Sequence, residues 1–192
     1  MVMTDVMLDI ETTGTNPAYN AIMQIGAVQF NYDTGEIGPV FNRCLAMAPN
    51  RFWSDSTRTW WGKQNKTVFN SIIDRMEDPG TVMRDLVTYA STDVPSGGLR
   101  FWAKPTIFDY TFVESYCEQF GLPMPFSYRT TRDLNTFMAA MAGGVNHQDM
   151  EHIEPPTNAH DALADCVFQL KLLFAAKDRN FGIQDAIYEE VN

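Results

Sequence analysis

The chain has 192 residues, of which 45% are hydrophobic and 20% charged, so a single globular domain over residues 1–192 is expected. Its net charge of −10 argues against a protein that coats long duplex DNA nonspecifically, although bound cations would offset part of this charge. The sequence has no apolar run long enough to cross a membrane and no basic N-terminal segment, so a cytoplasmic protein is expected. It also has no C-x-x-C pair, which argues against a disulfide framework and a zinc site.

Three extended segments begin the chain and are predicted to form an antiparallel meander. They span residues 5–10, 21–31 and 37–47, and the turn-forming sequence NYDTGE separates the second from the third. The hydrophobic period then changes to that of helices, which are predicted at residues 57–74 and 80–92.

The rest of the chain alternates between strands and helices. The predicted elements are a buried strand at 99–103, a helix at 105–120 ended by Gly121, a short strand in SYRTTRDL (127–134), a helix to about Ala142, a polar loop at 143–157, a helix at 158–177 and a short helix after Gly182. This order predicts an α/β fold whose mixed sheet is antiparallel at its start and parallel afterwards.

Two carboxylates interrupt the first apolar strand, in the stretch VMLDIETTG. Residues i and i+2 of a strand point to the same face, about 6.6 Å apart along the chain, so Asp9 and Glu11 are placed to share one divalent cation. The alternative is that both carboxylates lie on a solvated face. Thr12, Thr13 and Gly14 follow at once and offer hydroxyl and backbone N–H groups to a phosphate or sugar, with Gly14 permitting a tight turn.

A third carboxylate, Asp165, stands in the apolar helix ALADCVFQLKLLF. A bare charge there costs several kcal/mol of desolvation unless it is paired or metal-bound. His160 is five residues earlier, which corresponds to a divergence of about 140° on one helix. The two side chains therefore converge best if His160 lies at the frayed start of the helix; the alternative is a capping histidine and an exposed aspartate.

Asp109, in PTIFDYTFVESY, lies beside the packing face of the middle helix. Either a metal ligand or an acid that favours the helix dipole explains it. Together, four carboxylates and one histidine on well-separated elements are the inventory of a two-metal phosphodiester hydrolysis site. A neutral histidine nearby can take the proton of an attacking water.

The motifs DIETTG, FD at 108–109 and HDALAD at 160–165 resemble, in order and spacing, the three motifs of the DEDDh 3′–5′ exonucleases of the ribonuclease H-like superfamily. The resemblance spans about residues 6–175. It is closest to the small bacterial and phage branch that includes mycobacterial-type exoribonucleases, to which the contexts RTWWGKQ and RFWAKPTIFD are similar. It implies a ribonuclease H-like fold that hydrolyses single-stranded nucleic acid from its 3′ end to nucleoside 5′-monophosphates, with RNA favoured over DNA.

The resemblance also implies roles for individual residues. The acids that would bind two Mg²⁺ or Mn²⁺ ions are Asp9, Glu11, Asp109 and Asp165, and His160 would be the general base. In this family the first acid bridges both ions, and the third often acts through water. One departure is visible, because Ala103-Lys104-Pro105 stands where the family commonly has a His-Asn pair. Related exonucleases are often dimers, so a homodimer is one expectation.

Aromatic residues lie among basic ones at residues 51–66, which carry a local charge of +3. Trp53, Trp60 and Trp61 are therefore candidates for stacking on unpaired bases. Because adjacent tryptophans point different ways on a helix, we expect one of Trp60 and Trp61 in the core and the other at the rim of the site.

Two further acidic features are given other interpretations. The loop NHQDMEHIE (146–154) offers His147, Asp149, Glu151 and His152 as a second metal cluster, but a solvated loop is the favoured interpretation since no regular element fixes these side chains. Asp161 is interpreted as an acid of the first helical turn. The rival functions are a non-catalytic nucleic-acid-binding module and an endonuclease on the same fold.

Overall fold

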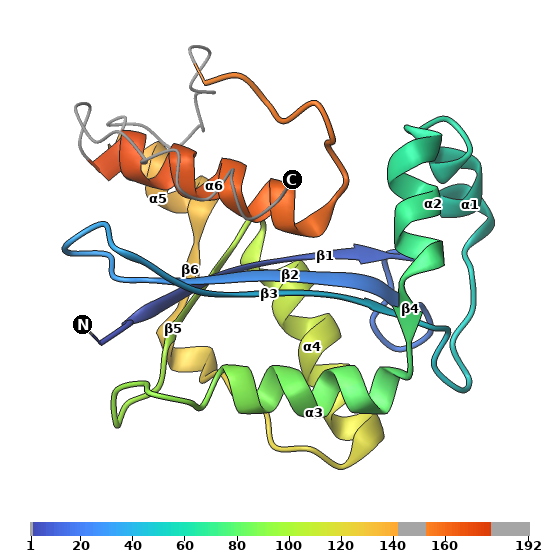
Figure 1. The fold of residues 1–192 in the computed structure, drawn as a ribbon, viewed down its shortest axis with the longest axis horizontal. Coiled ribbons are helices and arrows are strands. Elements are labelled where there is room, and N and C mark those ends of the chain that lie inside the picture. The colour runs from blue at the N-terminus through green and yellow to red at the C-terminus, as the bar shows by residue number, and fades with distance from the viewer. Residues whose placement is uncertain (1, 142–152, 178–192) are drawn as a thin grey trace.

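A computed structural model describes residues 2–141 and 153–177, which build a six-stranded sheet in the order β4-β3-β2-β1-β5-β6 (Figure 1). The meander is confirmed: β1 (Asp5–Thr12), β2 (Ile22–Phe30) and β3 (Ile37–Leu45) pair antiparallel. Every residue of β2 is buried, as befits a strand covered on both faces.

The other strands join in parallel. β5 (Arg100–Ala103) pairs with β1, β6 (Thr131–Asp133) with β5, and the two-residue β4 (Met76–Glu77) with β3. The mixed sheet is therefore as predicted, except that β4 was not foreseen because two residues carry no periodicity.

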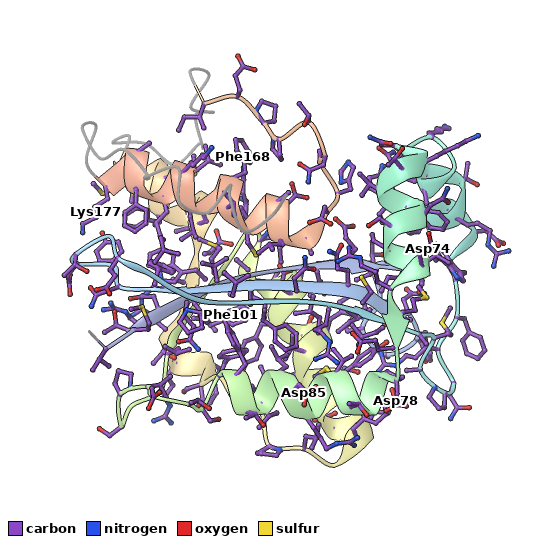
Figure 2. All side chains as sticks on the ribbon, in the orientation of Figure 1. Asp74, Asp78, Asp85, Phe101, Phe168 and Lys177 are labelled. Carbon is purple, nitrogen blue, oxygen red and sulfur yellow. The ribbon has the colours of Figure 1, made fainter. Side chains whose placement is uncertain are left out.

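Helices cover both faces of the sheet (Figure 1). One face carries α3 (Pro79–Tyr89) and α4 (Thr106–Phe120), and the other carries α5 (Leu134–Met141) and α6 (Ala162–Lys177). Side chains fill the space on both sides, with the fully buried Phe101 among them (Figure 2). Beyond the carboxyl end of β1 stand two short helices, α1 (Asp55–Trp61) and α2 (Lys66–Asp74).

Three predicted boundaries were wrong. The helix predicted at 57–74 is divided into α1 and α2, because the chain turns after α1 at Gly62 and the side chain of Asn65 caps α2 through the amide of Thr67. The helix predicted from residue 158 begins at Ala162, since His160 has a φ of 70° and does not continue a helix.

The third is the strand of residues 127–134, which is limited to β6 after a 3₁₀ turn (Tyr128–Thr130). The terminal helix predicted after Gly182 lies outside the described residues, as do His147, Asp149, Glu151 and His152 of the polar loop. Among the helices of residues 2–141 and 153–177, none has the length and apolarity to cross a membrane.

Candidate active site

The carboxyl end of β1 holds the first two acids. Glu11 is 8% exposed and Asp9 is half-buried, which excludes the solvated face as their environment. Gln169 of α6 donates from Nε2 to Asp9 Oδ1 at 2.7 Å. Because β5 pairs only with Asp5–Met7, the amide of Ile10 has no strand partner on that side and donates to Asp109 Oδ1 at 3.0 Å. That bond brings α4 and its 2% exposed carboxylate beside β1.

The start of α6 places His160 and Asp165. The left-handed backbone of His160 turns its N–H toward Asp165, whose Oδ2 accepts it at 3.0 Å. Asp161 lies just before α6 and caps it by accepting from the amide of Ala164 at 3.1 Å, so it is the capping residue and not the first-turn acid that was predicted. A Cβ at Gly26 of β2 would lie 2.4 Å from the backbone of Ala162, so a glycine is needed for α6 to approach the sheet this closely.

These elements bring three of the predicted residues together. Ligand atoms of Glu11, His160 and Asp165 all lie within 4.8 Å of one another, which is the spacing of groups that can share one ion. Asp9 and Asp109 are not members of this group, but both lie close enough to Glu11 to raise its pKa, and bonds with Gln169 and Ile10 hold them. The sequence predicted that His160 and Asp165 converge best if His160 lies at the start of the helix, and His160 is observed just before α6.

Burial dominates the electrostatics of the four acids. It raises the pKa of Asp109 to about 8 and that of Asp165 to about 6, although the His160 N–H bond opposes the latter shift. The pKa values of Asp9 and Glu11 are raised well above their usual range, first by burial and then by neighbouring acids of the group. Burial also lowers the pKa of His160 below its ordinary value.

The donor set fits a divalent cation. Within the described residues, neither Lys nor Arg forms an ion pair with any of these four acids; Arg75 instead pairs with Asp161 at 3.6 Å. Desolvated carboxylates without a basic partner are the oxygen ligands that Mg²⁺ and Mn²⁺ prefer. A cation would relieve the repulsion that raises the pKa of Asp9 and Glu11.

A cavity of about 440 Å³ opens beside Glu11. Its lining includes Thr12, Gly14, Trp60, Trp61 and Phe108. Trp61 is 4% exposed and donates from Nε1 to the Thr12 carbonyl at 3.1 Å, whereas Trp60 is 39% exposed. The prediction of one core and one rim tryptophan is therefore confirmed.

The rim tryptophan touches the candidate base. The ring centroids of Trp60 and His160 lie 4.6 Å apart in an edge arrangement. Thr13, in contrast, does not line the cavity: its buried hydroxyl donates to the Phe52 carbonyl and accepts from the Ala21 amide. At Gly14 a Cβ would meet the Asn20 side chain at 2.3 Å, so this glycine permits a close contact.

Sequence reasoning missed two glutamines. Gln169 follows Asp165 by four residues, so both lie on one face of α6, and a lone amide in an apolar helix was the available signal. Gln24 of β2 is fully buried; its Oε1 accepts from the Ala162 amide at 3.1 Å and its Nε2 donates to Asp161 at 3.0 Å. No pattern in the sequence links Gln24 to a helix that begins 138 residues later.

Comparison with known proteins gives one family match. The family described as "3'-5' exoribonuclease Rv2179c-like domain" matches residues 4–176. Among curated proteins, no relative matches the chain.

Solved structures share the fold. The zinc-bound E. coli ExoI–ssDNA complex superposes with a TM-score of 0.70 at 17% identity, covering 100% of this chain and 43% of that one. E. coli Exonuclease I in complex with a dT13 oligonucleotide gives 0.68 at 18% identity, covering 98% and 43%. S. pombe Pop2p, in its Mg²⁺- and Mn²⁺-bound form, gives 0.67 at 12% identity, covering 96% and 88%. The chain thus spans less than half of the ExoI chain, and at these identities the similarity establishes the ribonuclease H-like fold.

Proposed function

We propose that this chain, which belongs to the 3′–5′ exoribonuclease Rv2179c-like domain family, is a 3′–5′ exonuclease. It would remove nucleoside 5′-monophosphates one at a time from single-stranded nucleic acid, with RNA preferred to DNA. The observation that carries the proposal is the convergence of Glu11, His160 and Asp165 within 4.8 Å beside the cavity. A cavity of about 440 Å³ is in the range that holds a small ligand such as one nucleotide.

Asp9, Glu11, Asp109 and Asp165 would hold two divalent cations, Mg²⁺ or Mn²⁺. When bound, such ions would stabilise the charge on the attacking and leaving oxygens of the phosphodiester. The chain prepares this site by holding three of the four carboxylates in place, Asp9 through Gln169, Asp109 through the Ile10 amide and Asp165 through the His160 amide. Three acids on fixed strands and helices therefore need little reorganisation.

His160 would take the proton of the attacking water. Burial lowers the pKa of His160 below its ordinary 6.5, so the neutral ring that accepts a proton predominates at pH 7. The Trp60 ring at 4.6 Å limits where the imidazole can turn. Activity should therefore rise with pH while the ring loses its proton and then level off. Because burial lowers this pKa, the rise should lie below about pH 6.5, and a profile that stays flat from about pH 4.5 to 8.5 would count against this role.

The terminal nucleotide would occupy the cavity beside Glu11. Gly14 would offer backbone groups to its sugar or phosphate, and Trp60 and Phe108 would offer rings to its base. The Thr12 hydroxyl donates to the Gly14 carbonyl at 2.7 Å, so Thr12 shapes this turn through that bond. Thr13 would act here only indirectly, by fixing the turn through its bonds to Phe52 and Ala21.

The test is incubation with 5′-labelled single-stranded RNA and DNA oligomers in Mg²⁺, Mn²⁺ or EDTA, beside Asp9→Ala. We expect a metal-dependent ladder that shortens from the 3′ end, faster on RNA and absent in the variant. Cleavage of a circular strand would instead identify an endonuclease. Binding without cleavage of any strand would identify a non-catalytic module.

A further inference from the structure

A second cavity, of about 550 Å³, lies between α1 and α2. Its walls include the rings of Trp53, Trp61 and Phe69 and the polar side chains of Arg58, Lys66 and Asn70. Trp61 also lines the cavity beside Glu11, so one indole separates the two spaces. The bond from Trp61 Nε1 to the Thr12 carbonyl, at 3.1 Å, fixes that shared wall to the end of β1.

The walls combine aromatic rings with positive charge. Phe69 stands 5.4 Å from Trp61 and 6.4 Å from Trp53, centroid to centroid, and the guanidinium of Arg58 lies 5.9 Å from the Trp53 ring. Trp61 is buried in a small hydrophobic cluster, and Trp53 and Phe69 pack against that cluster but remain half-buried and line the cavity. Rings of this kind stack on a nucleobase of any sequence.

The two cations at this cavity have no acidic partner in the part of the chain that the structure describes. Arg58 and Lys66 are exposed and appear in none of its ion pairs, although the chain carries a net charge of −10. In a chain with such an excess of acids, two cationic side chains without an acidic partner beside three aromatic rings indicate a site for an anionic ligand. A planar ring that carries a phosphate is the ligand that complements both features.

We infer that the cavity between α1 and α2 is a subsite for an upstream nucleotide of the same single strand whose 3′ end enters the cavity beside Glu11. The inference rests on the proposed function and adds to it a preference for substrate length. A strand long enough to pass Trp61 stacks a base against Trp53 or Phe69 and places a phosphate near Arg58 and Lys66. A dinucleotide fills the first space with one nucleotide and has only one left to pass Trp61, so it should gain least from the second space.

The test compares the full chain with Arg58→Gln/Lys66→Gln on single-stranded oligomers of increasing length from the dinucleotide. Both positions are exposed, so the fold is retained. The matched control is Lys63→Gln/Arg129→Gln, which removes the same charge from exposed positions that do not line the cavity. We expect kcat/KM of the first pair to fall roughly tenfold on long strands and to stay within about twofold on the dinucleotide.

Two additional readouts separate direct binding of the phosphate from a general effect of charge. The slope of log affinity against log salt should become shallower by about 0.7 for each phosphate that the protein no longer neutralises, in the cavity variant only. Trp53→Phe should retain most of the length dependence, because a ring remains, and Trp53→Leu should abolish it. An equal decrease at all strand lengths, or the same decrease in the control pair, would overturn the subsite.

Failure of the proposed function looks different. If the wild-type chain hydrolyses no strand, binding is measured in Ca²⁺ by quenching of tryptophan fluorescence. Length-dependent binding that Arg58→Gln/Lys66→Gln weakens would then support the subsite in a non-catalytic module. Binding that is independent of length, or absent, would overturn it.

Discussion

Asp5 and Glu11 lie at opposite ends of β1, and both carboxylates are buried, at 0% and 8% exposed. Asp5 is fully partnered: Arg100 donates to it at 2.7 and 2.6 Å, and Trp102 Nε1 at 2.8 Å. Glu11 has acids for neighbours, and its pKa is raised well above the usual range, chiefly by burial and by Asp9. At the Asp5 end of β1 the protein itself supplies the counter-charge, whereas at the Glu11 end no basic side chain of the described residues does so and a bound cation would.

The difference distinguishes an acid of the fold from an acid of the site. The parallel register of β1 and β5 sets Arg100 opposite Asp5, so the pair is closed by the sheet itself. At the other end β5 has already ended, and Glu11 and Asp165 meet with His160 where α6 begins. A buried charge without a partner is costly, which is why such groups mark functional sites.

The largest expected effect is on activity at the unpartnered end. Glu11→Gln and Asp165→Asn should each lower kcat/KM by about a thousandfold or more, because each removes a cation ligand worth several kcal/mol. Both variants should unfold at the same or a higher denaturant concentration than the wild type in EDTA, since a desolvated charge is gone. Activity within about tenfold of the wild type in either variant would contradict the assignment of that acid.

Asp5→Asn should have the opposite pattern, with a loss of stability and no loss of activity. It leaves Arg100 without its carboxylate and should lower the free energy of unfolding by about 3 kcal/mol, the low end for a broken buried pair because the Arg100 side chain is 35% exposed. The folded fraction should keep its cation dependence and its kcat. The measurement is urea unfolding together with kinetics below the midpoint. A large decrease in kcat with unchanged stability would place Asp5 in the site after all.

The third effect is on the pH dependence of stability without metal. The folded pKa values of Asp109 (about 8) and Asp165 (about 6) lie above their ordinary 3.8, so the folded state holds protons that the unfolded state has released. In EDTA the free energy of unfolding should therefore be highest near pH 4 and fall as pH rises toward about 8.

Saturating Mg²⁺ or Mn²⁺ should remove most of this fall. A cation at about a hundred times its Kd adds about 2.7 kcal/mol of stability, and Asp165→Asn should reduce that gain. The measurement is denaturant unfolding across this pH range with and without the ion. A free energy of unfolding in EDTA that rises through the same pH range would show that burial does not raise the pKa values of these acids.

Much of this comparison could be predicted from the sequence, because β1 breaks its own pattern. An apolar strand with carboxylates at i and i+2, and an aspartate in an apolar helix, identify the unpartnered end without any coordinates. The break at Gly62, the start of α6 at Ala162 and the strand β4 depend on local backbone geometry that periodicity does not specify.

The hydrogen-bond partners of the acids could not be predicted from the sequence, for a different reason. Arg100 is 95 residues from Asp5, and Gln169 is 160 residues from Asp9. Only the register of β1 with β5 and the position of α6 on the sheet join them, and both are products of the whole fold. Thr13 shows the same limit, because its hydroxyl is used by Phe52 and Ala21 and its place in the motif did not predict this.

The smallest expected effect concerns Gln169, whose side chain alone among the described residues donates a hydrogen bond to Asp9. Its Nε2 donates to Asp9 Oδ1, while its buried Oε1 has no partner among the described residues. Gln169→Leu removes the bond and the unsatisfied oxygen together, so stability should change by less than about 1 kcal/mol. Asp9 is then no longer held in one orientation, and the Mg²⁺ concentration for half-maximal activity should rise about tenfold with little change in kcat at saturation.

Gln29→Leu is the matched control, since Gln29 is equally buried on β2 and donates to the Tyr89 carbonyl. It should leave the Mg²⁺ titration unchanged. If both variants shift the titration alike, the effect belongs to packing. If Gln169→Leu alone shifts it, the Gln169 amide fixes the orientation of Asp9 as Arg100 fixes that of Asp5. Because the amide is neutral, the charge of Asp9 remains available to bind the cation.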